Sequence, residues 1–144
     1  MSTLIVTDEI IIHTTPSKVW EVLVQPRHIK SWDGLPDHYP DQPLKAGNEL
    51  VWALPNGRYS KSTVVRAEKE KRLQLSLYVS DWEVDPAPED ILFSYELLIH
   101  EKNTRLRLRH GDFSILPNGQ SYFEASTEFA SVSKHRIKRL AELL

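Results

Sequence analysis

The sequence contains no cysteine among its 144 residues. This absence excludes disulfide bonds, thiolate metal ligands and a cysteine nucleophile. An excess of one charge is lacking too, because 18 lysines and arginines are offset by 20 aspartates and glutamates, for a formal net charge of −2. Nucleic-acid-binding modules usually carry a clear basic excess, so we expect no nucleic-acid partner. Apolar runs long enough to cross a bilayer are also missing, and we predict no membrane span.

The chain length favours a single domain. Domains of about 100–150 residues are the commonest, and no internal repeat, low-complexity segment or linker divides this chain. We therefore predict one domain over residues 1–144. The segment Met1–Val6 lacks the basic and apolar regions of a secretory signal, so we expect a cytoplasmic protein.

Alternating apolar residues between short turns predict six β-strands. The expected strands are Thr3–Ile12, Glu49–Leu54, Tyr59–Ala67, Leu73–Val79, Ile91–His100 and Thr104–Phe113. Asp8 interrupts the otherwise apolar face of the first strand. Because the later strands are joined by short connections, and parallel neighbours would need a crossover segment, we predict an antiparallel sheet.

Helix signals occur in two places. Thr15 followed by Pro16 predicts a helix start, because proline lacks the N–H group that would have no partner there. Pro26 ends this helix, and a second short helix is expected at about Arg27–Trp32. After Gly119 no breaker follows, and apolar residues spaced i, i+3, i+4 predict one long amphipathic helix. That helix is the only predicted element long enough to cover a face of the sheet.

Several segments carry a family resemblance. Ile10–Trp20 reads as a strand, a small residue, proline, two polar residues and Val-Trp, and Trp32 follows at a typical distance. Leu44–Asn48 has glycine and a polar residue ahead of a strand, and Thr104–His110 matches a penultimate strand. These segments resemble the START-like superfamily (SRPBCC, or helix-grip, domains). Within it they are most similar to the bacterial Aha-type homologues of the heat-shock-protein ATPase activator.

The resemblance implies a fold of the α+β class. A curved six-stranded antiparallel sheet would wrap around a long C-terminal helix, with two short helices after the first strand. It also implies a cavity between the sheet and that helix, which superfamily members use for lipids and other apolar molecules. Some members are cyclases or hydrolases, and the Aha-type relatives act on a chaperone. A fold alone does not choose among these functions.

Strand parity and the apolar face of the last helix together select ten inward-facing candidates for contact with a small hydrophobic ligand. They are Trp52, Leu54, Leu75, Leu77, Phe93, Tyr95, Leu108, His110, Phe129 and Ser133. The alternative is that these side chains only pack the core, as large apolar residues usually do. Ser126, Ala130 and Ser133 favour a pocket, because they leave room on the last helix where a filled core would carry leucine or isoleucine.

His110 is the one candidate for catalysis. It lies on an apolar strand parity, near Tyr95 if the two strands pair, and a histidine there could exchange a proton with a ligand. The alternative is a buried core histidine. The sequence has no phosphate-binding loop, nucleophile elbow or dinucleotide fingerprint. We therefore expect binding rather than catalysis, with a small cyclase or hydrolase using His110 as an alternative.

Metal and cofactor sites are not expected. His28, Asp33, Asp37 and His38 gather near one loop, but their spacing matches no metal-ligand template, so a solvated loop is the expectation.

Basic residues cluster on the last helix and the penultimate strand. They are Lys134, His135, Arg136, Lys138 and Arg139, with Arg105, Arg107 and Arg109. They could dock an acidic partner, although Ile137 and Leu140 at core spacing indicate an ordinary solvated face. The partners expected are thus a small apolar molecule or, alternatively, a chaperone or other protein, with monomer and homodimer both open.

Overall fold

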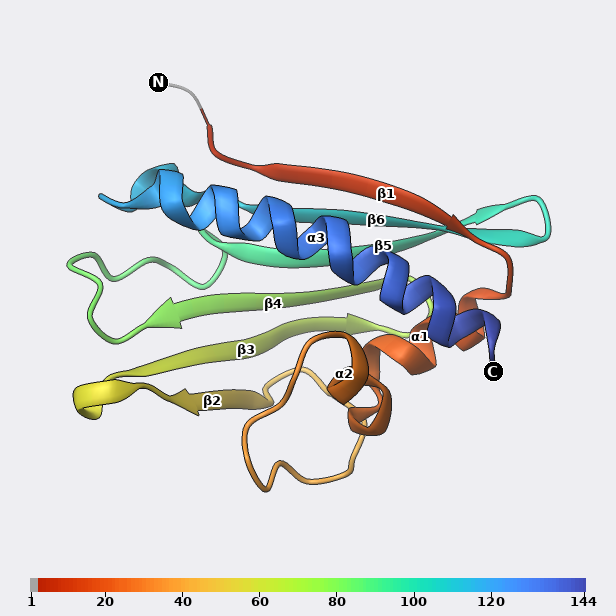
Figure 1. Ribbon diagram of the computed structural model, residues 1–144, viewed down its shortest axis with the longest axis horizontal. Coiled ribbons are helices and arrows are strands. Elements are labelled where there is room, and N and C mark those ends of the chain that lie inside the picture. The colour runs from red at the N-terminus through yellow and green to blue at the C-terminus, as the bar shows by residue number, and fades with distance from the viewer. Residues whose placement is uncertain (1–2) are drawn as a thin grey trace.

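A computed structural model describes residues 3–144; the single-domain prediction also covers Met1 and Ser2, which lie outside the described residues. All six strands belong to one antiparallel sheet in the order β1-β6-β5-β4-β3-β2 (Figure 1). The strands are β1 (Val6–Ile12), β2 (Glu49–Ala53), β3 (Tyr59–Glu68), β4 (Arg72–Val79), β5 (Leu92–His100) and β6 (Asn103–Gly111). The helices are α1 (Pro16–Val24), α2 (Pro26–Trp32) and α3 (Gly119–Glu142), with short 3-10 turns η1 (Pro55–Gly57) and η2 (Phe113–Ile115).

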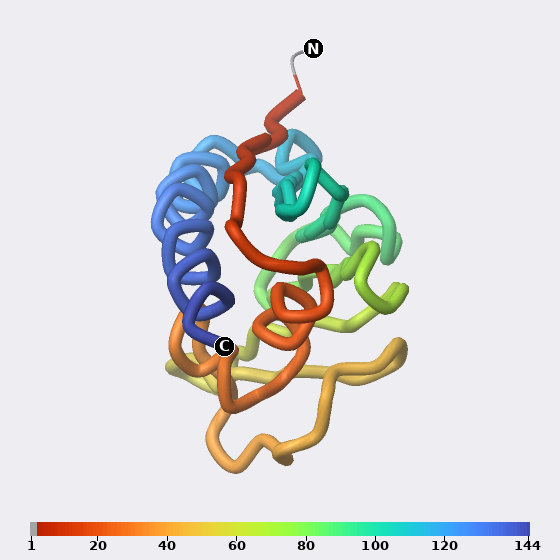
Figure 2. The backbone as a smooth tube through the Cα atoms, turned by 90° about the vertical axis from the view of Figure 1, so that its right-hand side faces the viewer, coloured from red at the N-terminus to blue at the C-terminus, as the bar shows by residue number. Residues whose placement is uncertain are grey.

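The long helix and the sheet form two layers. The sheet curves around the side on which α3 lies, and α1 and α2 close one end of that side (Figures 1 and 2). This arrangement confirms the predicted α+β helix-grip fold, with its six strands, two short helices after β1 and one long C-terminal helix. The helix α3 packs against β1 and β6, so it lies toward the β1 edge of the sheet. The inner face of the strands toward the other edge is therefore left for other contacts.

Prolines set the starts of both short helices. Pro16 is the first residue of α1, as predicted from its position after Thr15. Pro26 does more than end α1, since it is also the first residue of α2, preceded by Gln25 in an extended conformation. At the other end of α2, the indole N–H of Trp32 donates a buried hydrogen bond of 2.8 Å to the carbonyl of Val22. This bond fixes α2 against α1.

Asp8, which interrupts the apolar face of β1, pairs with the long helix. Its carboxylate Oδ1 accepts a hydrogen bond of 2.7 Å from Nζ of Lys134, and the two side chains are 24% and 19% exposed. One turn further along α3, Nζ of Lys138 donates to the backbone carbonyl of Ile11 at 2.9 Å. Two lysines of the predicted basic face therefore attach α3 to β1.

Replacing Lys134 with Met is expected to lower the free energy of unfolding by about 1–2 kcal/mol, because the half-buried Asp8 carboxylate would lose its cationic partner. The double variant Asp8→Leu/Lys134→Met should recover most of that loss, since neither charge is then left on the inner face. Urea unfolding curves measure both effects. Arg136→Met, on the exposed side of the same helix, is the matched control and should change stability by less than about 0.5 kcal/mol. Equal losses in Lys134→Met and Arg136→Met would contradict the assignment.

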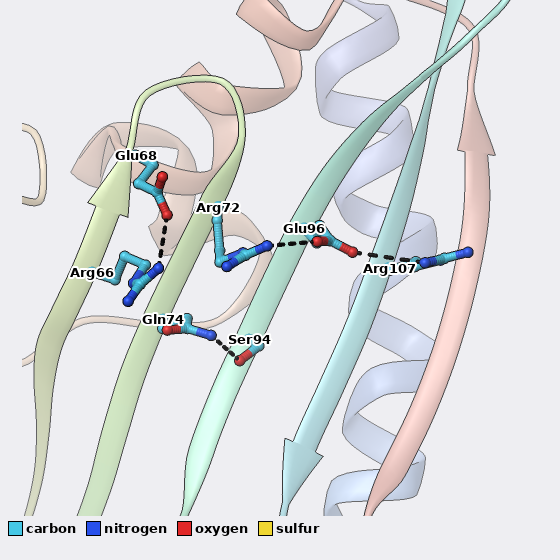
Figure 3. A network of polar contacts seen from close by, with 7 residues as sticks. All are labelled: Arg66, Glu68, Arg72, Gln74, Ser94, Glu96 and Arg107. Atoms are coloured by element: carbon cyan, nitrogen blue, oxygen red, sulfur yellow. Dashed lines mark hydrogen bonds and ion pairs between the residues drawn. The ribbon is translucent and has the colours of Figure 1, made fainter. Parts of the chain in front are cut away.

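The face of the sheet turned away from α3 carries a row of alternating charges. Glu68, Arg72, Glu96, Arg107 and Glu9 stand opposite one another on β3, β4, β5, β6 and β1. Glu96 lies 2.9 Å from Arg72 and 3.8 Å from Arg107, both measured nitrogen to oxygen, in the network drawn in Figure 3. Arg107 also lies 3.4 Å from Glu9. The outward arginine Arg107 is thus engaged within the molecule, which leaves little free positive charge for an acidic partner at this position.

Candidate functional site

A cavity of about 290 Å³ lies between the inner face of β2–β5 and the helices α2 and α3. It exists because α3 packs toward the β1 edge of the sheet, so the strands nearer the other edge are not covered by the helix. Two short helices close one end, where Leu23 of α1 and Ile29 of α2 reach the cavity wall. The cavity therefore follows from the lateral placement of α3.

Strands β4 and β5 provide the apolar floor. Leu73, Leu75 and Leu77 occupy alternate positions of β4, so all three project to the same face of the sheet. Phe93 and Tyr95 do the same on β5, where they stand opposite Leu75 and Leu73. Alternate rows of leucine and aromatic side chains give a surface suited to an apolar molecule.

The helices contribute aromatic and small side chains to the opposite wall. Trp32 of α2 packs edge-on against Tyr95, with ring centroids 5.6 Å apart. From α3 come Ala125, Ser126 and Phe129. Small residues at two of these three positions keep the helix from filling the space.

Serine hydroxyls supply polar groups on the β3 side. Ser60 and Ser62 line the cavity from alternate positions of β3, opposite Trp52 and Leu50 of β2. Hydroxyls can both donate and accept hydrogen bonds, so they suit the orientation of a polar substituent on an apolar ligand.

Six of the ten sequence-predicted contact residues line this cavity. They are Trp52, Leu75, Leu77, Phe93, Tyr95 and Phe129. The structure places the other four, Leu54, Leu108, His110 and Ser133, outside its wall. Leu54 follows the end of β2, whereas Leu108, His110 and Ser133 are buried.

His110 is enclosed behind that wall. Its ring stacks on Phe93 with centroids 4.3 Å apart and also contacts Tyr95 and Phe129, at 5.5 and 6.1 Å. The residue is 0% exposed, and within residues 3–144 neither ring nitrogen has a hydrogen-bond partner. Burial lowers the pKa of His110 from 6.5 to about 3, with a smaller opposing effect of the Asp8 charge. His110 is therefore neutral near pH 7, and rings of the wall separate it from the cavity.

Asp33 is the functional candidate that the sequence pattern did not assign to the pocket. It follows the last residue of α2 and lines the cavity, where it is the one charged side chain among the lining residues described. Sequence alone considered Asp33 only as one of several loop residues near His28, because nothing in a local pattern shows which way a helix end will face. The adjacent Trp32, which lies at the distance typical of the resembled family, was the nearest available signal.

The cavity perturbs the ionisation of two groups. Although Asp33 is reached by solvent at the opening, surrounding protein raises the pKa of its carboxyl from 3.8 to about 6. Burial, and to a smaller extent the nearby Asp33 charge, raise the pKa of the Tyr95 phenol well above its usual range. Tyr95 therefore keeps its proton, while Asp33 changes charge in the mildly acidic range.

Along residues 3–144, no group of three or more histidine, aspartate or glutamate side chains is placed to hold a metal ion. None of the helices in this range is long and apolar enough to cross a membrane. A second hollow, of about 700 Å³, lies on the outer face of the sheet and is lined by Arg72, Glu96 and Arg107 of the charged row. Because these charges pair with one another, the inner cavity is the better candidate for an apolar ligand.

The fold and its inner cavity define a START-like, helix-grip domain. The profile of the family described as "Activator of Hsp90 ATPase homolog 1-like protein" matches residues 13–144. The chain belongs to this family, as the resemblance of its segments predicted. Among curated proteins, none matches the chain.

Solved structures share the fold across nearly the whole chain. Protein MLL2253 from Mesorhizobium loti is 21% identical, with 96% of this chain and 97% of that chain covered and a TM-score of 0.74. The Aha1 dimer from Colwellia psychrerythraea is 15% identical, with 96% of each chain covered and a TM-score of 0.70. Protein Ms6760 from Mycobacterium smegmatis is 16% identical, with 96% and 90% covered and a TM-score of 0.66. At these identities the similarity establishes the fold.

Proposed function

We propose that this protein binds a small hydrophobic ligand, such as a lipid or an aromatic metabolite, in the cavity beneath α3. The observation that carries the proposal is the composition of the wall, in which leucines and aromatic rings surround a few hydroxyls and one carboxylate. Ligand sites are typically concave and apolar with a small number of polar groups. Their volumes are about 300–1,000 Å³, so the cavity here suits a compact ligand.

Burial of apolar surface would supply most of the binding free energy, at roughly 25 cal/mol per Å² removed from water. Trp32 and Trp52 offer flat surfaces for an aromatic or ring-containing ligand, and Ser60 or Ser62 can accept a hydrogen bond from a polar substituent. Most of the wall comes from strands and helices, with Leu44 added from the connection between α2 and β2. Little ordering is therefore required when the ligand enters, which favours affinity.

Titration with N-phenyl-1-naphthylamine, an uncharged probe that fluoresces strongly in apolar surroundings, tests the proposal. We expect saturable binding of one probe per chain and an increase of the melting temperature with probe concentration, because a ligand that binds only the folded state stabilises it. Leu75→Trp should reduce the affinity at least tenfold by filling the cavity, whereas Leu98→Trp on the other parity of β5 should not. Absence of saturable binding in the parent protein would refute the proposal.

A second candidate function is the regulation of a chaperone, favoured by membership of the Hsp90-ATPase-activator family. In this function the outer surface of the domain, rather than the cavity, would contact the partner, in the cytoplasm. Measurement of ATP hydrolysis by Hsp90 with and without this protein tests it. We expect stimulation that saturates with added protein, and unchanged hydrolysis would exclude this role.

Self-association accompanies the second candidate. The Colwellia psychrerythraea relative is described as a dimer, and we propose that this chain also forms a homodimer in solution. Sedimentation equilibrium at micromolar concentration should then give twice the 16.7 kDa chain mass. A mass of one chain at every concentration would show that it is a monomer.

A further inference from the structure

Asp33 is the one charged side chain among the described residues of the cavity wall, and its charge affects which ligands the cavity can bind. Asp33 stands at the end of α2, next in sequence to the cavity-lining Trp32. The remaining described lining residues are aliphatic or aromatic side chains, an alanine and serines. Asp33 is solvent-exposed at the opening, so a ligand that fills the cavity either leaves this carboxylate hydrated or compensates its lost hydration with a donor of its own.

From this placement we infer that the natural ligand has an apolar, ring-containing body and a protonated amine or other strong hydrogen-bond donor that contacts the Asp33 carboxylate. The inference rests on the proposed function and specifies its ligand class. A cationic donor would form a charge-assisted hydrogen bond with the carboxylate, the stronger kind of hydrogen bond in proteins. An anionic ligand of the same shape would be repelled.

The contact of Trp32 with Tyr95 places the end of α2, and with it Asp33, at one end of the β4–β5 floor. Tyr95, whose phenol is affected by the Asp33 charge, stands opposite Leu73 at the α2 end of the floor. Leu77 lies four residues further along β4, opposite Ser62 of β3. Four residues of a strand span roughly 13 Å. A ligand lying along β4 would therefore place its amine near Asp33 and its rings over Leu75 and Leu77.

The ionisation of Asp33 supports this arrangement. With a pKa of about 6, raised by the surrounding protein although the side chain is solvent-exposed at the opening, the carboxyl is mostly ionised at pH 7 and can pair with a cation. Among the other described wall residues, Tyr95 is the titratable one, and its phenol stays protonated. Binding of a cation should therefore weaken as the pH falls through 6, whereas binding of a neutral ligand of the same shape should not.

The test compares three probes of nearly equal shape by isothermal titration calorimetry: 1-naphthylmethylamine, 1-methylnaphthalene and 1-naphthoate. We expect the amine to bind roughly tenfold more tightly than the methyl compound at pH 7.5, and the carboxylate to bind most weakly. Between pH 7.5 and pH 5 the affinity for the amine should fall about fivefold, with no change for 1-methylnaphthalene. Equal affinities for the three probes would overturn the inference.

Variants assign the preference to one side chain. Asp33→Asn should bring the amine to the affinity of 1-methylnaphthalene and remove the pH dependence, and Asp33→Glu should retain both. Asp37→Asn, an exposed residue of the following loop, is the matched control and should behave as the parent. If 1-methylnaphthalene binds but the amine binds no better, the cavity function stands and only the ligand class is wrong. If none of the three probes binds, both are wrong.

Discussion

Lowering the pH from 7 to 4.5 is expected to reduce the free energy of unfolding by about 2.5 kcal/mol through His110 alone. In the folded protein the imidazole is fully buried between Phe93, Tyr95 and Phe129, and burial lowers its pKa from 6.5 to about 3. Below pH 6.5 the imidazole of His110 therefore binds a proton in the unfolded chain but not in the folded chain. Stability is lost progressively down to about pH 3, and above pH 6.5 the group has no such effect.

The variant His110→Leu isolates this contribution. Its unfolding free energy should fall less between pH 7 and pH 4.5 than that of the parent, by about 2.5 kcal/mol, as measured by urea unfolding at each pH. At pH 7 the variant should also be at least as stable, because two buried nitrogens without partners are removed. His135→Leu, on the exposed side of α3, should keep the parent's pH dependence. Identical pH profiles for His110→Leu and the parent would show that His110 has the same pKa in the folded and unfolded states, which would contradict this account.

Replacing Ser126 with Leu is expected to weaken ligand binding at least tenfold while making the empty protein more stable. Ser126 is a buried residue of α3 at the cavity wall, so a leucine there would extend into the space that a ligand needs. The same side chain would bury apolar surface in the unliganded protein, worth about 1–2 kcal/mol if it fits without strain. Fluorescence titration with N-phenyl-1-naphthylamine measures the affinity, and thermal unfolding measures the stability.

The matched control is Ser131→Leu. This substitution makes the same chemical change, serine to leucine, on the exposed side of the same helix. It should leave affinity and stability close to those of the parent. If Ser126→Leu bound the probe as tightly as Ser131→Leu, the probe would be bound somewhere other than beneath α3.

The fold was predictable because its signals are local. Alternation of Leu73, Leu75 and Leu77 identifies a strand with one apolar face, and the structure places all three on the inner face of β4. The proline after Thr15 marks the start of α1 in the same local way. Pro26 shows the limit of such signals, since a helix stop and the start of the next helix look alike in sequence.

The position of the cavity was less predictable, because it depends on where α3 lies across the sheet. That position is set by contacts between distant residues, including the pair of Asp8 with Lys134 and the bond from Lys138 to Ile11. Strand parity alone therefore assigned Leu108 and His110 to the pocket, whereas α3 packs over β6 and leaves the space over β2–β5. Strand parity predicts on which face of the sheet a side chain lies, but not how far its strand lies from the edge of the sheet.

Asp33 could not be assigned for a related reason. A carboxylate at a helix end is usually solvated, as Asp33 is, and only the packing of α2 against the rest of the domain places it at the opening of an apolar cavity. The buried pair of Trp32 with Val22 fixes that orientation, yet an indole hydrogen bond to a carbonyl ten residues earlier leaves no trace in the local pattern. The role of a carboxylate at such a position can be assigned only once the positions of the helices are known.

The central claim is that the space beneath α3 accepts an apolar guest, and NMR of methyl-labelled protein with 1-methylnaphthalene tests it most directly. We predict intermolecular nuclear Overhauser effects from the probe to the methyl groups of Leu50, Leu75 and Leu77, which line the cavity. No such effects should reach Leu92 and Leu98, on the other parity of β5. Effects at Leu92 or Leu98 alone, or at none of the five leucines with the probe at saturating concentration, would contradict the account.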